Sequence, residues 1–115
     1  MIVRLYAGPD GESHFEEIEP AFEQRGPSER SPLEGADGIE FGRYQPGHFS
    51  DWHHAPRRQY VFGIAGLMEI GIGDGTVLSF GPGDVLLAED LNGRGHTMRV
   101  VGSEPRIHSA VPLRE

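Results

Sequence analysis

The chain has 115 residues, and its 18 acidic residues outnumber its 10 basic residues, so its formal net charge is −8 with neutral histidines. This balance argues against a protein that binds nucleic acid, because phosphate contacts need clustered cations. Every basic residue is an arginine and no cysteine occurs, which excludes Schiff-base lysines, phosphate loops that end in Gly-Lys, thiol nucleophiles, thiolate metal sites and disulfides.

The apolar segments of the chain are short. No run of 18 apolar residues predicts a membrane span, and the N-terminus lacks the basic and apolar pattern of a secretory leader. We therefore expect a soluble cytoplasmic protein that contacts neither membranes nor nucleic acid. At this length we expect one domain over residues 1–115, with a core small enough that a homodimer would add stability.

The first 38 residues contain few consecutive apolar positions. Ile2–Tyr6 predicts a short edge strand, and turn signals rich in glycine and proline follow at residues 8–11, 25–28 and 31–32. We expect residues 1–38 to form an N-terminal strand and an extended arm that packs across a second subunit.

From residue 39 onward, short apolar runs rich in β-branched and aromatic residues alternate with turns. The predicted strands cover residues 39–44, 49–54, 59–65, 67–72, 76–80, 85–88, 96–101 and 106–111. Asp74-Gly75 separates two of these runs and is a strong signal for a tight hairpin. No window of ten or more residues keeps a period of 3.6, so we expect little helix. Eight short strands predict an all-β antiparallel barrel or jelly roll over residues 39–111.

Histidines are the main candidates for metal ligands in a chain without cysteine. His53 lies near the end of one predicted strand, Gln59 begins the next, and His96 opens a later strand. In a barrel, polar side chains from three strands can converge at the mouth. Three other histidines stand at no regular spacing from His53, Gln59 and His96, and we expect them at the surface: His14, His48 and His108.

The spacing of residues 47–66 resembles the first sequence motif of the cupin family, Gly-x5-His-x-His-x3-Glu-x6-Gly. The matching positions are Gly47, His53 and Gly66, with Gln59 in the place of the glutamate. Residues 80–87, Phe-Gly-Pro-Gly-Asp-Val-Leu-Leu, look like the second cupin motif, and His96 looks like its histidine. The resemblance covers about residues 39–108 and implies a double-stranded β-helix, the cupin barrel.

Carried over to this chain, the resemblance implies a divalent transition metal, such as nickel, iron, manganese or zinc, held by His53, Gln59 and His96. Two positions depart from the family pattern, because Ala55 replaces the second histidine and Gln59 replaces the glutamate. An amide oxygen donates less than a carboxylate, so the metal would be bound less tightly and remain a stronger Lewis acid. Some cupins use glutamine at this position, so the substitution does not abolish a site.

Several neighbours of the first motif are further candidates. His54 stands one position before the missing histidine, which puts it on the opposite face of a strand unless a bulge intervenes. Arg57 and Arg58 form the only adjacent cation pair, and we interpret Arg57 as a candidate contact for an anionic substrate, with ion pairs to the acidic N-terminal segment as the alternative. Glu89 and Asp90 are either replacement ligands or part of a solvated loop, which is the simpler interpretation.

Together these features predict a metal-dependent enzyme that acts on a small polar or anionic organic molecule, of isomerase, lyase or dioxygenase type. The alternative is a non-catalytic module that binds a small ligand, favoured by the missing imidazole at Ala55 and the missing carboxylate at Gln59. An inward-pointing His54 would restore a third imidazole and favour the enzyme. Neither a Gly-x-Ser-x-Gly nor a His-Glu-x-x-His motif occurs, so serine hydrolase and zincin chemistry have no support.

Overall fold

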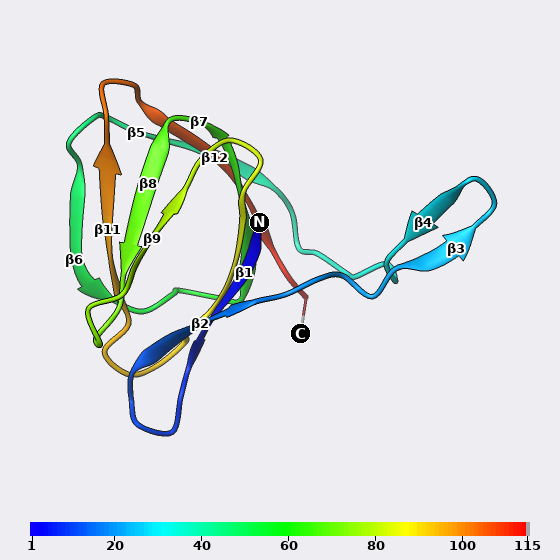
Figure 1. Ribbon diagram of the computed structural model, residues 1–115, viewed down its shortest axis with the longest axis horizontal. Coiled ribbons are helices and arrows are strands. Elements are labelled where there is room, and N and C mark those ends of the chain that lie inside the picture. Colours follow the sequence, from blue (N-terminus) through cyan, green and yellow to red (C-terminus); the bar gives the residue numbers. More distant parts are fainter. Residues whose placement is uncertain (115) are drawn as a thin grey trace.

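A computed structural model describes residues 1–114, which form strands and no helix (Figure 1). Ten strands build two sheets that pack against each other, and two short strands form a separate hairpin. The all-β class predicted from the sequence is therefore confirmed. Within residues 1–114, no helix of the length and hydropathy needed to cross a membrane is present.

The larger sheet has six strands in the order β2-β1-β10-β7-β12-β5. Its strands are β1 (Ile2–Ala7), β2 (Ser13–Glu17), β5 (Glu40–Tyr44), β7 (Gln59–Ala65), β10 (Val85–Glu89) and β12 (Arg106–Pro112). The edge position expected for Ile2–Tyr6 is wrong, because β1 pairs with β10 on one side and with β2 on the other. Val3 and Leu5 on β1 are buried, so this strand is part of the core rather than of an arm.

The smaller sheet has four strands in the order β6-β11-β8-β9. Its strands are β6 (Phe49–His53), β8 (Leu67–Gly71), β9 (Val77–Phe80) and β11 (His96–Val101). The hairpin predicted at Asp74-Gly75 joins β8 to β9, and Gly75 has a φ of 91°, which favours glycine. All eight strands predicted from residue 39 onward are present, each with ends within one residue of the prediction.

The core lies between the two sheets. Its buried apolar side chains come from both: Val3, Leu5 and Leu86 from the larger sheet, and Met68, Ile70, Phe80, Met98 and Val100 from the smaller one. Strand pairing does not close the described residues into the barrel expected over residues 39–111, since each strand pairs only within its own sheet. The sheets are instead held together by side-chain packing, as in a sandwich.

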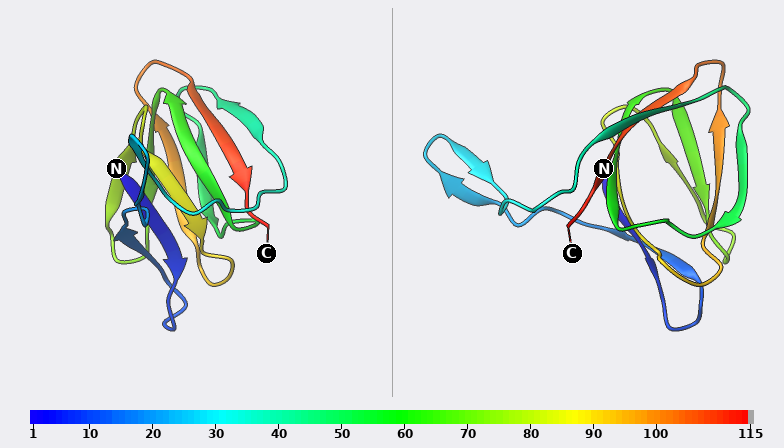
Figure 2. Two further views of the ribbon diagram at one scale, coloured as in Figure 1. Left: turned by 90° about the vertical axis from the view of Figure 1, so that its right-hand side faces the viewer. Right: turned by 180° about the vertical axis from the view of Figure 1, so that it is seen from behind.

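Strands β3 (Glu23–Arg25) and β4 (Ser28–Arg30) form a hairpin that projects away from the two sheets, as Figure 1 and the right-hand view of Figure 2 show. This projecting segment falls within the expected arm, but an arm over the whole of residues 1–38 is not confirmed. Strands β1 and β2 belong to the larger sheet because they pair in register with it and with each other. Packing of the hairpin across a second subunit stays a prediction.

Candidate functional site

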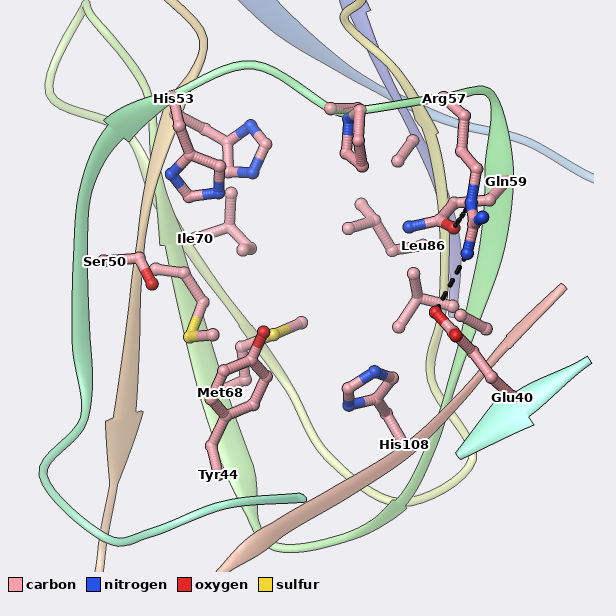
Figure 3. A pocket seen from close by; sticks show the side chains of 17 residues that line it. Glu40, Tyr44, Ser50, His53, Arg57, Gln59, Met68, Ile70, Leu86 and His108 are labelled. Carbon is pink, nitrogen blue, oxygen red and sulfur yellow. Dashed lines mark hydrogen bonds and ion pairs between the residues drawn. The ribbon is translucent and has the colours of Figure 1, made fainter. Parts of the chain in front are cut away.

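A cavity of about 360 Å³ lies between the sheets (Figure 3). Most of its polar lining falls into three groups: His53 with His96, then Glu40 with Arg57 and Gln59, and finally Tyr44 with His108. Ser50 is the remaining polar residue of the lining. Apolar side chains occupy much of the remaining wall: Val61, Met68, Ile70, Leu86 and Met98. Cavities that combine an apolar lining with a few convergent polar groups are typical of small-molecule sites.

Two of the predicted metal ligands, His53 and His96, are neighbours across strands β6 and β11. They are register partners, and their ring centroids lie 4.5 Å apart. His53 Nδ1 donates to the carbonyl of Asp51 at 2.7 Å, and His96 Nδ1 donates to Asp90 Oδ2 at 2.6 Å. Because each Nδ1 carries the hydrogen, each Nε2 keeps the lone pair with which a neutral imidazole binds a metal.

Asp90 lies directly behind His96 and is fully buried. Its Oδ2 accepts hydrogen bonds from His96 and from the hydroxyl of Ser13 at 2.8 Å, so strand β2 supports the site. The solvated loop expected here is wrong for Asp90, because the bonds to His96 and Ser13 hold its carboxylate inside the protein. The sequence offered no signal for this role, since Asp90 stands at the start of a turn-rich segment.

Gln59 lines the same cavity from the larger sheet, on the wall across from His53 (Figure 3). Its Oε1 accepts from Arg57 Nε at 3.0 Å, and Arg57 also forms an ion pair with Glu40 at 2.9 Å. No group of three or more His, Asp or Glu side chains within residues 1–114 is arranged to hold a metal ion. The two imidazoles are adjacent and each is bonded through Nδ1, whereas the amide oxygen of Gln59 already accepts from Arg57.

The other candidates near the first motif do not join the two imidazoles. His54 is exposed, does not line the cavity, and donates from Nδ1 to the carbonyl of Ala55 at 3.0 Å. Ala55, at the position of the missing histidine, is buried and lines the cavity. Strand β6 thus ends with a single imidazole at the cavity.

The two adjacent arginines have different roles. Arg57 lines the cavity, while Arg58 pairs with Glu89 and lies 3.8 Å from Glu34. Glu89 also accepts from Arg4 Nε at 2.6 Å. Burial alone would raise the pKa of Glu89, but the hydrogen bonds from Arg58 and Arg4 lower it below its usual range. Both arginines therefore pair with the acidic N-terminal segment of residues 1–46, Arg57 with Glu40 and Arg58 with Glu34. Glu89 is a structural carboxylate.

The surface position expected for His108 is wrong. This residue is half-buried on β12, lines the cavity, and stacks on Tyr44 with ring centroids 5.7 Å apart. Burial and the charge of Arg106 lower the pKa of His108, although Glu40 acts in the opposite direction. The signal in the sequence was strand alternation, which places His108 on the same face as buried Ala110. His14 and His48 are half-buried and do not line the cavity.

No protein-family model matches this chain, and no curated protein matches it. Among solved structures it is similar to an uncharacterised conserved protein with a double-stranded β-helix domain from Klebsiella pneumoniae, with 27% identity, a TM-score of 0.53, and coverage of 71% of this chain and 67% of that one. It is also similar to a conserved protein of unknown function from Streptococcus pyogenes, with 19% identity, a TM-score of 0.49, and coverage of 74% of this chain and 69% of that one. A protein from Neisseria meningitidis is similar with 15% identity, a TM-score of 0.47, and coverage of 86% of each chain.

The double-stranded β-helix domain of the Klebsiella structure agrees with the two-sheet architecture described above. The chain therefore has a cupin-like double-stranded β-helix fold.

Proposed function

We propose that this protein is a metal-dependent cupin that acts on a small organic molecule bound between its two sheets. The observation that carries the proposal is the His53–His96 pair, whose rings are adjacent and whose Nδ1 atoms are both bonded to acceptors. Nickel, iron, manganese and zinc all accept imidazole nitrogen, and an outer hydrogen bond to Nδ1 is the usual companion of such a ligand.

Gln59 is the proposed third ligand, and it would have to exchange its bond from Arg57 for the metal. A bound divalent metal would supply Lewis acidity that polarises an oxygen of the substrate. Arg57 would then be free to orient a polar or anionic group of the substrate, still charge-balanced by Glu40 at 2.9 Å. The apolar wall, with Met68 and Leu86, would limit water around the bound molecule.

The second candidate is a non-catalytic module that binds a small ligand in the same cavity. It is favoured by the ligand count, because His54 lies outside the cavity and Ala55 replaces the second imidazole of the motif. With two imidazoles and a neutral amide, the metal would be held more weakly than by three imidazoles and a carboxylate.

Metal analysis tests the proposal. Untagged protein purified without chelator is compared, by inductively coupled plasma mass spectrometry, with the double variant His53→Ala, His96→Ala. We expect close to one metal ion per chain in the wild type and background levels in the variant. The matched control is His14→Ala, His48→Ala, which removes two histidines outside the cavity and should keep the metal. Wild-type protein that contains no metal and takes up none of the four added ions would overturn the proposal.

Two further measurements separate the alternatives. Gln59→Ala should weaken metal binding about tenfold if the amide is a ligand, and should leave it unchanged if the amide only pairs with Arg57. Metal-loaded protein is then mixed with small keto and hydroxy acids and followed by NMR. Conversion that disappears in the His53→Ala, His96→Ala variant supports the enzyme, whereas binding without conversion supports the module.

A further inference from the structure

The end of the cavity formed by His108 and Tyr44 has hydrogen-bonding groups that the metal site does not use. In Figure 3, His108 lies across the cavity from His53, and the Tyr44 hydroxyl points into the open space. The figure marks hydrogen bonds among Glu40, Arg57 and Gln59, but none from His108 or Tyr44 to another lining residue. Both side chains therefore present free polar atoms to whatever fills the cavity.

The position of the His108 ring is fixed by packing rather than by hydrogen bonds. His108 is the register partner of Gly42 on β5, and a Cβ atom on Gly42 would lie 2.3 Å from His108 Cε1. Glycine at this position therefore makes room for the imidazole, which stacks on Tyr44 at an interplanar angle of 20°. A ring held in this way keeps both nitrogens available, unlike the rings of His53 and His96.

The electrostatic surroundings favour a neutral imidazole. Burial and the positive charge of Arg106 lower the pKa of His108, and the opposing charge of Glu40 does not cancel this effect. A neutral imidazole offers one hydrogen-bond donor and one acceptor, and the Tyr44 hydroxyl can serve as either. These groups match a hydroxyl or carbonyl better than a carboxylate, because neither side chain carries a positive charge that would pair with an anion.

We propose that His108 and Tyr44 form a second binding end of the cavity, which receives an uncharged hydroxyl or carbonyl group of a ligand whose other end lies at His53 and His96. This rests on the small-molecule function proposed above and narrows its ligand class. The ligand has metal-binding oxygens at one end, an apolar body against Met68 and Leu86, and a neutral polar group at the other end. Leaving such half-buried polar groups without partners costs free energy that a bound hydroxyl would recover.

Two probes that differ by one hydroxyl test this assignment: 4-methylcatechol and 3,4-dihydroxybenzyl alcohol. Both carry the same pair of neighbouring oxygens for a metal, and only the second carries a hydroxyl at the far end. Binding to zinc-loaded protein is measured by isothermal titration calorimetry. We expect the alcohol to bind about tenfold more tightly to the wild type, as one added hydrogen bond predicts. His108→Phe and Tyr44→Phe should each reduce this preference to about twofold or less.

The matched control is His14→Phe, which replaces a histidine on β2 outside the cavity and should keep the tenfold preference. A preference that is equal in wild type and His108→Phe, or that is absent from the wild type, would overturn the assignment.

A measurement on metal-free protein separates this proposal from the metal proposal. The ring resonances of His108 are followed by ¹H–¹⁵N NMR while each probe is added. We expect the alcohol to shift them more than 4-methylcatechol does, even if no metal binds. Loss of metal binding together with a retained shift at His108 would overturn the metal site alone, whereas metal uptake without any shift at His108 would overturn the second end alone.

Discussion

The two walls of the cavity hold their histidines in different ways. On the smaller sheet, His53 and His96 each donate from Nδ1 to an oxygen of the protein, at 2.7 and 2.6 Å. On the larger sheet, His108 is held by the bare backbone of Gly42 and by the ring of Tyr44. The first arrangement bonds Nδ1 and leaves Nε2 for the proposed metal, while the second leaves both nitrogens for the proposed ligand.

All three histidines line the same cavity, so their position does not distinguish them. The hydrogen bonds of their ring nitrogens do, because of the three only His53 and His96 donate from Nδ1 to an oxygen of the described residues. Asp90 makes the contrast clear, because this buried carboxylate accepts from His96 on the smaller sheet and from Ser13, and it bonds to no histidine of the larger sheet. On the larger-sheet wall, by contrast, burial and the charges of Arg106 and Glu40 act on the pKa of His108, and no carboxylate among residues 1–114 is hydrogen-bonded to its ring.

The largest effect is expected from Asp90→Ala. This change leaves the buried donors of His96 and Ser13 without an acceptor and should lower the free energy of unfolding by about 3 kcal/mol. It should also weaken metal binding by about 10- to 100-fold, because His96 loses its orienting bond. Urea unfolding and competitive metal titration measure the two effects.

Ser13→Ala is the control for Asp90→Ala, because it removes one of the two hydrogen bonds and leaves the one to His96 intact. We expect a loss of about 1 kcal/mol and unchanged metal affinity. Equal metal affinity in Asp90→Ala and wild type would remove the proposed difference between the two walls.

An intermediate effect is expected from Gly42→Ala. The added methyl group would lie 2.3 Å from His108 Cε1, so the imidazole must leave its place against Tyr44. We expect a loss of about 1–3 kcal/mol in unfolding free energy, the usual result of overpacking. Gly81→Ala is the matched control, since its nearest neighbour would be 3.7 Å away. Thermal unfolding compares the pair, and equal losses would show that Gly42 does not make room for His108.

The smallest effect concerns pH and His108. In the unfolded chain this histidine takes up a proton near its ordinary pKa of 6.5, whereas the folded protein takes it up only at lower pH. The stability that neutral His108 contributes is thus present above about pH 6.5 and is lost as the pH falls through the lowered pKa. His108→Phe should therefore lose less stability than the wild type between pH 8 and about pH 5, measured by urea unfolding.

The value at pH 8 serves as the internal control, because His108 is neutral there in both states. Parallel pH profiles for wild type and His108→Phe would show that the ring is as free to take up a proton as in the unfolded chain. The larger-sheet wall would then carry no distinct electrostatic environment.

Much of the fold could be predicted from local sequence. Strands β7 and β11 match their predicted bounds, because β-branched runs between glycine-rich turns define a strand without reference to distant residues. The position of β1 could not be predicted, since its pairing with β10 joins residues more than 80 positions apart. Barrel closure likewise depends on how the sheet edges meet, which no local pattern encodes.

The candidate site, like the fold, has features that follow from local sequence and features that depend on tertiary packing. The sequence by itself determined the strands, the turn chemistry and the motif positions of His53, Gln59 and His96, because these depend on spacing along the chain. Only the tertiary structure decided that Asp90 is buried against Ser13, that Arg57 pairs with Glu40, and that His108 faces the cavity over Gly42. The physical reason is that hydrogen bonds and burial depend on which distant strands become neighbours, and that arrangement is set by packing of the whole core.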